Sequence, residues 1–133
     1  MSSRTEQFDQ VIECLNLYIE GTFEGDVGKL KQVFHEKAIL SGHIYPPGAP
    51  AEGVFMIAPV DVLYDHMAQS PSPKAEGAPY VARVGEVTLR GKLARAVVFE
   101  DGLFGHDFVN DLQLSHVDGA WRITSKAFVS DEH

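Results

Sequence analysis

"DFVNDLQLSHVDGAWRITSKAF", residues 107–128, decides how the second half of the chain folds. Two apolar-rich runs flank Asp118-Gly119, a dipeptide typical of a tight hairpin turn. Counting outward from this turn places Asp111 directly opposite Lys126, where opposite charges stabilise an antiparallel pair by about 0.2–1 kcal/mol. The sequence therefore predicts a cross-strand ion pair in a regular register. One bulge would instead put the two side chains on opposite faces of the sheet.

The rest of this half also has the pattern of antiparallel strands. Arg90-Gly91 is a second tight turn between apolar runs. The strands expected are residues 80–89, 92–99, 104–116 and 120–128. Consecutive strands joined by short turns predict a meander.

The first half of the chain predicts helices. Ser3 and Glu6 have the spacing of a capping box. The apolar residues that then recur at helical spacing are Phe8, Val11, Ile12, Leu15, Tyr18, Ile19 and Phe23. Asp26 is the expected N-cap of a second, short helix that ends near Phe34.

A short strand, a loop and a third helix are expected between these helices and the meander. The short strand covers residues 38–41, and three prolines and three glycines predict an irregular loop over residues 42–53. A third helix is expected to begin near Pro59, which a first helical turn tolerates. Residues 70–79 are expected to form a further loop, because proline and serine punctuate them.

Length, charge and cysteine content limit the class of protein. The whole chain, residues 1–133, is long enough for one domain with a real core. A net charge of −8 without a basic patch argues against nucleic-acid partners and an anionic membrane surface. No stretch approaches the roughly 20 apolar residues that span a membrane, so the expected location is the cytoplasm. The lone Cys14 excludes an internal disulfide and multi-cysteine zinc sites.

The order of elements indicates the fold class. Helices come first and strands follow, which is typical of α+β proteins and not of a parallel βαβ sheet. About three amphipathic helices packed on one face of a curved antiparallel sheet would enclose a cone.

Two stretches carry a resemblance to a known superfamily: residues 18–40, a helix-loop-helix ending in Phe34-His35, and residues 107–128. The chain resembles the nuclear transport factor 2-like superfamily, and more closely its group named putative lumazine-binding, near the polyketide-cyclase-like proteins. The resemblance implies a cone-shaped, cystatin-like fold with an apolar pocket between sheet and helices. It also implies a homodimer formed through the outer face of the sheet.

The resemblance leaves the function open, since this superfold hosts isomerases, cyclases, dehydratases and transport adaptors. We expect a protein that binds a small apolar or aromatic molecule. The first alternative is an isomerase, cyclase or dehydratase acting on an enolisable ketone. The second is a dimeric protein-interaction module without catalysis.

Candidate catalytic residues follow from the ketosteroid isomerase branch of the superfamily. Members of that branch use a helix tyrosine and a neutral aspartic acid as an oxyanion hole, with a second aspartate as the base. Tyr18 and Asp111 match the first two roles, but the base position has no carboxylate and only His43 is near it. A cation such as Lys126 beside Asp111 would lower the pKa that this role needs raised. The ion pair is therefore the preferred interpretation of Asp111.

The candidate ligand-binding residues are mainly aromatic side chains that could equally be ordinary core: Tyr18, Phe34, Tyr64, Met67, Phe108, Asp111 and Trp121. The six histidines have neither the HxxxH nor the HxH spacing that would place two of them on one metal ion. The glycines match neither a phosphate loop nor GxGxxG. The sequence thus predicts no metal and no cofactor.

Overall fold

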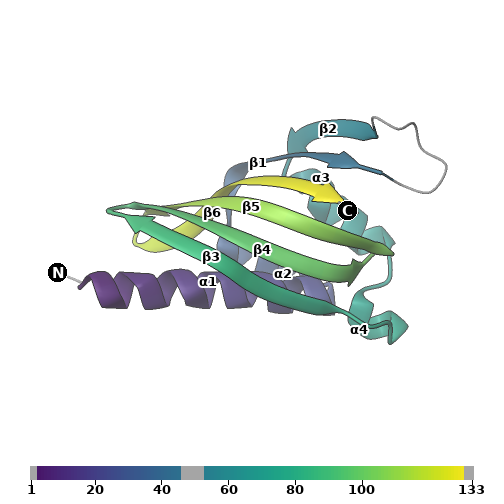
Figure 1. The fold of residues 1–133 in the computed structure, drawn as a ribbon, viewed down its shortest axis with the longest axis horizontal. Helices are drawn as coiled ribbons and strands as arrows, with labels where there is room; N and C mark the ends of the chain where they lie inside the picture. Colours follow the sequence, from purple (N-terminus) through teal and green to yellow (C-terminus); the bar gives the residue numbers. More distant parts are fainter. Residues whose placement is uncertain (1–2, 46–52, 131–133) are drawn as a thin grey trace.

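The structure is a computed structural model, and it describes residues 3–45 and 53–130. The helices are α1 (Arg4–Glu24), α2 (Val27–Val33), α3 (Asp61–Gln69) and α4 (Pro73–Glu76). The strands are β1 (Phe34–Ile44), β2 (Val54–Pro59), β3 (Val81–Arg90), β4 (Leu93–Leu103), β5 (His106–Val117) and β6 (Ala120–Ser130). The strands form one sheet in the order β2-β1-β6-β5-β4-β3, and α1 runs along one face of it (Figure 1). The predicted α+β class and cone-like layering are confirmed.

Helix α1 begins at the predicted Ser3 cap and ends at a glycine. The Ser3 hydroxyl accepts a hydrogen bond of 3.1 Å from the backbone N–H of Glu6, which satisfies one of the free donors of the first turn. The helix ends at Gly25, whose φ of 69° lies in the left-handed region that glycine adopts without strain. Val11, Leu15 and Tyr18 form its buried stripe against the sheet.

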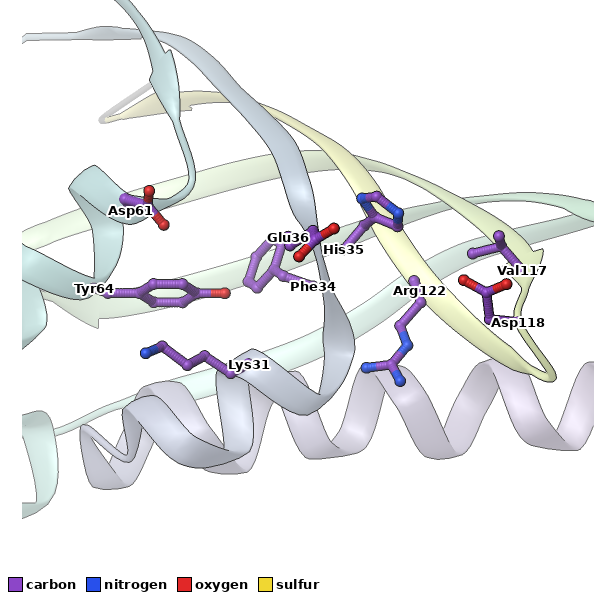
Figure 2. Close-up of a pocket in the computed structure, with 9 residues that line it drawn as sticks. All are labelled: Lys31, Phe34, His35, Glu36, Asp61, Tyr64, Val117, Asp118 and Arg122. Atoms are coloured by element: carbon purple, nitrogen blue, oxygen red, sulfur yellow. The ribbon is translucent and has the colours of Figure 1, made fainter.

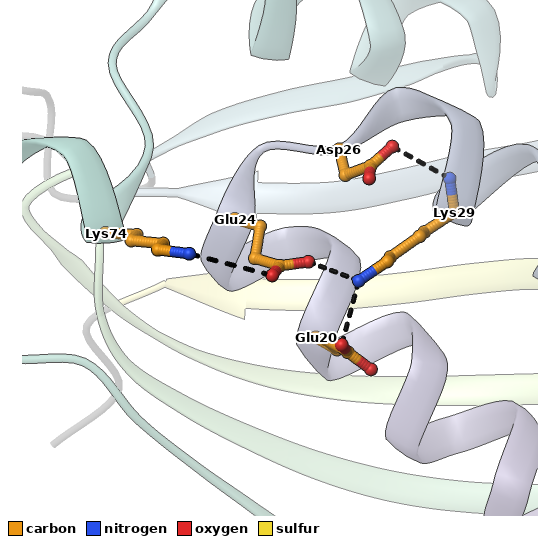
Figure 3. A network of polar contacts seen from close by, with 5 residues as sticks. All are labelled: Glu20, Glu24, Asp26, Lys29 and Lys74. Carbon is orange, nitrogen blue, oxygen red and sulfur yellow. Dashed lines mark hydrogen bonds and ion pairs between the residues drawn. The ribbon is translucent and has the colours of Figure 1, made fainter.

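A cluster of charges joins α1 to the two short helices beside it (Figure 3). The Asp26 carboxylate caps α2 by accepting a hydrogen bond of 3.1 Å from the Lys29 backbone N–H. The Lys29 ammonium lies 2.8 Å from Glu20 and 2.5 Å from Glu24, and Lys74 of α4 lies 3.8 Å from Glu24. These contacts connect the C-terminal end of α1 to α2 and α4.

The sheet contains more strand than the sequence predicts. Strands β3 to β6 form the expected antiparallel meander, and β1 adds to β6 in parallel. The short strand predicted over residues 38–41 is part of the eleven-residue β1, which includes Gly42 and His43 from the predicted loop. Strand β2 and the one-turn helix α4 were not predicted, and α3 begins after Pro59, which ends β2. Residues 46–52 of the predicted loop lie outside the described residues.

The predicted register of the β5–β6 hairpin is wrong beyond Leu114. Pairs are regular from the turn to Leu114 and Ile123, but Gln113 then pairs with Ser125, so Thr124 is an extra residue in β6. This is a β-bulge, in which two residues of one strand oppose one of the other. The Thr124 hydroxyl donates a hydrogen bond of 3.3 Å to the Gln113 carbonyl across it.

The bulge separates the two charges that were expected to pair. Leu112 lies opposite Lys126, and Asp111 lies opposite Ala127. The predicted Asp111–Lys126 ion pair is therefore wrong. Asp111 instead forms an ion pair with Arg95 of β4 on the outer face, with contacts of 2.9 and 2.5 Å, and Lys126 points into the interior.

The interior face of the sheet faces α1 and α3. It carries alternate residues of each strand, including Val98 of β4, Leu112 of β5 and Leu40 of β1, all buried. Gly42 of β1 lies so close to Phe128 of β6 that an added Cβ would be 2.5 Å from the Phe128 carbonyl oxygen. No helix within residues 3–45 and 53–130 is both long enough and apolar enough to cross a membrane.

Candidate functional site

A cavity of about 330 Å³ lies between α3, the β1–β2 pair and the interior face of β4 to β6. Its walls are mostly apolar: Leu40, Ile44, Met56, Val62, Leu63, Leu103, Phe104, Phe108 and Phe128. The polar side chains among its lining residues are Lys126, His66 and His106, and none of the lining residues is acidic. The cavity thus combines apolar walls with a few nitrogen-bearing groups, as small-molecule sites commonly do.

Lys126 reaches this cavity because the bulge at Thr124 turns it inward. It is only 6% exposed, and its ammonium donates a hydrogen bond of 2.8 Å to the Tyr18 hydroxyl. The same nitrogen lies 5.2 Å from the centre of the Tyr18 ring and 5.8 Å from that of Phe128. Burial lowers the pKa of Lys126, because a charged ammonium is poorly solvated there, and the Glu100 carboxylate partly opposes this effect.

Behind Lys126, Glu100 of β4 is fully buried and accepts three hydrogen bonds. The Tyr18 hydroxyl donates to its Oε1 at 2.5 Å, and the Asn110 amide donates to the same oxygen at 3.0 Å. The Tyr80 hydroxyl donates to Oε2 at 2.7 Å. A buried carboxylate needs such donors, since it has lost its water.

The three central groups form an ordered chain of hydrogen bonds: the Lys126 ammonium donates to the Tyr18 hydroxyl, which donates to the Glu100 carboxylate. Burial, and then the charge of Glu100, raise the pKa of Tyr18 well above its ordinary value. The same two causes raise the pKa of Tyr80. Both tyrosines are therefore neutral donors at pH 7. We call Lys126, Tyr18, Glu100, Tyr80 and Asn110 the buried polar network.

The Asn110 side chain has one unused atom in the network. Its amide nitrogen donates both to Glu100 and, at 3.1 Å, to the Val98 carbonyl. Its Oδ1 is buried without a hydrogen-bond partner among the described residues. Both partners of the nitrogen are acceptors, which fixes the orientation of the amide.

A second hollow of about 480 Å³ lies on the outside, between α2, α3, β1 and the β5–β6 turn (Figure 2). Tyr64 points across it toward Phe34, and the Lys31 ammonium lies 5.5 Å from the Tyr64 ring. Its remaining lining residues are His35, Glu36, Asp61, Val117, Asp118 and Arg122. We call this hollow the outer groove. It is larger than the cavity, but water-exposed charges of both signs line it, so a ligand would bury less apolar surface there.

The structure distributes the predicted ligand-binding residues over several places. Phe108 lines the cavity. Tyr18 is not among the lining residues, but its hydroxyl contacts Lys126, which is. Phe34 and Tyr64 line the outer groove. Met67 and Trp121 are core residues, and the Trp121 indole N–H donates to Gln7 at 2.8 Å.

The three candidate catalytic residues do not come together. Tyr18 is buried on the interior side of the sheet. Asp111 is half-exposed on the outer face, where the Arg95 guanidinium lowers its pKa. His43 is exposed on β1 and packs against the Phe55 ring at 5.1 Å. The geometry therefore offers no oxyanion hole made from Tyr18 and a neutral Asp111.

Sequence reasoning missed most of the buried polar network. The burial of Glu100 could have been predicted, because alternate residues of a strand share one face and Glu100 follows Ala94, Ala96 and Val98 on the inward face of β4. Lys126 stands out in the sequence as a charge within an apolar run, but its predicted partner, Asp111, is wrong. Tyr80 and Asn110 carry no local signal of their roles.

A family model described as "Putative lumazine-binding" matches residues 6–129, which include the whole network. The chain belongs to the "Putative lumazine-binding" family. A comparison with curated proteins gives no match for this family member.

Solved structures show that this "Putative lumazine-binding" chain has the nuclear transport factor 2-like fold. A protein of unknown function from Shewanella baltica, described as NTF2-like, is 20% identical, with a TM-score of 0.82 and 100% of both chains covered. An NTF2-like protein of unknown function from Silicibacter pomeroyi is 22% identical, with a TM-score of 0.81, covering 97% of this chain and 99% of that one. A third, from Methylobacillus flagellatus, is 23% identical with a TM-score of 0.79, covering 98% and 97%. At these identities the likeness concerns the fold alone.

Proposed function

We propose that the protein binds a small, flat, largely apolar molecule in the cavity, with one oxygen function of that molecule at the Lys126 nitrogen. The observation that carries the proposal is a buried ammonium at the wall of a mostly apolar space. Ligand sites typically place a few polar groups in apolar walls, and those groups fix the orientation of the ligand.

The size of the cavity limits the ligand. A volume of about 330 Å³ lies near the lower end of the range of roughly 300–1,000 Å³ that is typical of ligand sites. One or two fused rings are therefore the favoured size. The Phe104, Phe108 and Phe128 side chains in the walls favour an aromatic ring, which can pack edge-to-face against them.

The charge of the cavity favours an acidic or carbonyl oxygen. Lys126 has three donors and uses one of them on Tyr18 within the described part of the chain. His66 and His106 add nitrogen atoms to the same walls, and no lining residue is acidic. A ligand carboxylate or carbonyl would therefore meet the donors of Lys126 and no acidic side chain in the walls of the cavity. The family description names lumazine, a more polar bicycle that has more heteroatoms than these walls can satisfy.

Titration with 1-naphthoate, naphthalene and lumazine tests this proposal. Thermal shift and ligand-observed NMR measure the binding of each compound. We expect naphthoate to bind most tightly and naphthalene more weakly. Lys126→Met should abolish the preference for naphthoate and leave naphthalene bound. Equal, weak effects of all three compounds on the wild type would overturn the proposal.

Neighbouring residues of β2 provide a matched pair of variants. Met56 lines the cavity, whereas Ile57 points outward and is 66% exposed. Met56→Trp should fill the cavity and weaken naphthoate binding by at least about tenfold, equivalent to 1.4 kcal/mol. Ile57→Trp should bind like the wild type. Equal affinity of the two variants would place the ligand elsewhere.

We further propose that the chain forms a homodimer through the outer face of the sheet. Leu93 and Phe99 of β4 are 52% and 40% exposed, and both lie on the outer face of the sheet with the half-buried Val97 between them. Exposed apolar side chains gathered on one face are typical of protein interfaces. Analytical ultracentrifugation of the wild type and Phe99→Lys tests this. A dimer that the substitution dissociates is expected, and a monomeric wild type at all concentrations would overturn it.

A further inference from the structure

We propose that the Lys126 nitrogen condenses with an aldehyde or ketone held in the cavity and forms an imine. This inference rests on the proposed function, because the carbonyl compound must occupy the same cavity as the aromatic ligand. The chemistry requires an amine that is accessible from the cavity, a route by which its proton leaves, and walls that keep water away from the product.

The position of Lys126 meets the first and third requirements. Its side chain lines the cavity, and its nitrogen lies against the Tyr18 and Phe128 rings. Leu40 of β1, the strand partner of Lys126, also lines the space. An aromatic or alkyl aldehyde would bury its hydrocarbon part against these walls, so that its carbonyl carbon faces the nitrogen.

The Tyr18–Glu100 hydrogen bond provides the route for the proton. One proton moves from Lys126 to the Tyr18 oxygen while the Tyr18 proton moves to Glu100, over donor–acceptor distances of 2.8 and 2.5 Å. Lys126 becomes a free amine, Glu100 becomes a neutral acid and Tyr18 remains a phenol. The transfer removes the positive charge from the buried Lys126 nitrogen, where an ammonium is poorly solvated. The lowered pKa of Lys126 agrees with this direction of transfer.

The reaction balances in protons and charge. The free amine forms a C–N bond to the carbonyl carbon, and a proton passes from nitrogen to the carbonyl oxygen, which gives a carbinolamine. The C–O bond then breaks, and the leaving hydroxyl takes the proton stored on Glu100 through Tyr18 and departs as water. The products are a protonated imine on Lys126, a Glu100 carboxylate and one water, so the buried pair of charges is restored.

Reductive trapping with benzaldehyde and sodium cyanoborohydride at pH 7 tests the inference, with peptide mapping by mass spectrometry. We expect one benzyl group on Lys126 before any appears on the exposed Lys37 and Lys92. Met56→Trp should abolish the modification at Lys126 and leave the exposed lysines as reactive as before. Ile57→Trp should behave like the wild type. Benzylation of the exposed lysines with Lys126 untouched in the wild type would overturn the inference.

Tyr18→Phe tests the route for the proton, because it removes the hydroxyl and keeps the ring. The rate at Lys126 should fall on the order of 100-fold at pH 7, and its pH profile should shift toward alkali. A Tyr18→Phe variant with an unchanged profile would overturn the role of the relay. Wild type that binds naphthoate but is not benzylated at Lys126 overturns the imine alone. Wild type that does neither overturns the proposed function as well.

Discussion

The Tyr18 hydroxyl of α1 and the Glu100 carboxylate of β4 are 82 residues apart in the chain and 2.5 Å apart in space. Their hydrogen bond connects the long helix to β4, the strand next to the β3 edge of the sheet, and Lys126 of β6 donates to the same hydroxyl. Three elements therefore meet at one oxygen atom. Changing any of these three groups should affect both the stability of the fold and the cavity beside it.

Glu100→Gln should strongly destabilise the protein. The substitution keeps the size of the side chain, but it leaves the buried Lys126 without a nearby negative charge. It also replaces one carboxylate oxygen, which accepts from a tyrosine, by an amide NH2 group, which cannot accept. Removing one partner of a buried charge pair costs about 3–5 kcal/mol. Urea unfolding at pH 7 measures this loss in the free energy of unfolding.

Asp111→Asn is the matched control for that experiment. It also removes one carboxylate charge, but from an ion pair with Arg95 on the outer face, where both side chains are exposed to water. Exposed ion pairs contribute little to stability, so the unfolding free energy should hardly change. Equal losses for the two variants would contradict a special role for the buried network.

Tyr18→Phe and Lys126→Met should have non-additive effects. Each single change breaks the same hydrogen bond and leaves the other group buried, so the second change costs less once the first is made. We expect a coupling energy of about 1–2 kcal/mol in a double-mutant cycle of unfolding free energies. Tyr64→Phe combined with Lys126→Met should be additive, since Tyr64 lies at the outer groove.

The network should make stability fall in alkali through Tyr80. Burial and Glu100 raise its folded pKa, whereas an unfolded tyrosine titrates near 10. Above about pH 10 the unfolded state releases this proton and the folded state keeps it, so the folded state binds more protons and stability declines as the pH rises. The stabilising effect is complete below pH 10. Wild type should therefore lose about 1.4 kcal/mol per pH unit relative to Tyr80→Phe above that pH, and a constant difference would contradict the raised pKa.

Cys14 should be inert in the folded protein. Burial raises the pKa of its thiol to about 12, and the sulfur lies 3.7 Å from the Trp121 carbonyl oxygen. Thiol reagents attack the thiolate, so at pH 8 the native protein should react on the order of a thousandfold more slowly than the unfolded chain. Colorimetric thiol titration with and without denaturant measures both rates. Rapid labelling of the native protein would show that α1 opens locally.

Local chemistry explains which parts of the fold were predictable. The Ser3 cap, the Asp26 cap and the Asp118-Gly119 turn are each decided by residues close in sequence, and all three are confirmed. Strand β2 was missed because it follows a stretch rich in proline and glycine and pairs with a strand, β1, that was itself predicted too short. Its own residues Val54, Phe55 and Ile57 are of types that favour strands.

The candidate site was harder to predict because long-range contacts determine it. A hydrogen bond between Tyr18 and Glu100 needs two elements from opposite halves of the chain. The face of Lys126 depends on one unpaired residue, Thr124, for which the sequence has no glycine or proline signal. The sequence pattern allows a bulge in β6 but does not indicate that one is present. The two charges that the chain brings into chemical contact are consequently Lys126 and Glu100, and not Lys126 and Asp111.

The bulge at Thr124 also makes β6 respond unequally to insertions and deletions during evolution. Thr124 and Ser125 together oppose Gln113, so a chain lacking Thr124 would have a regular strand in which Lys126 still faces inward. A chain that straightened the strand without losing a residue would turn Lys126 outward, beside Asp111, and bring Ala127 inside. Relatives one residue shorter at this point can therefore retain the lysine in their cavity. Relatives of equal length without the bulge cannot.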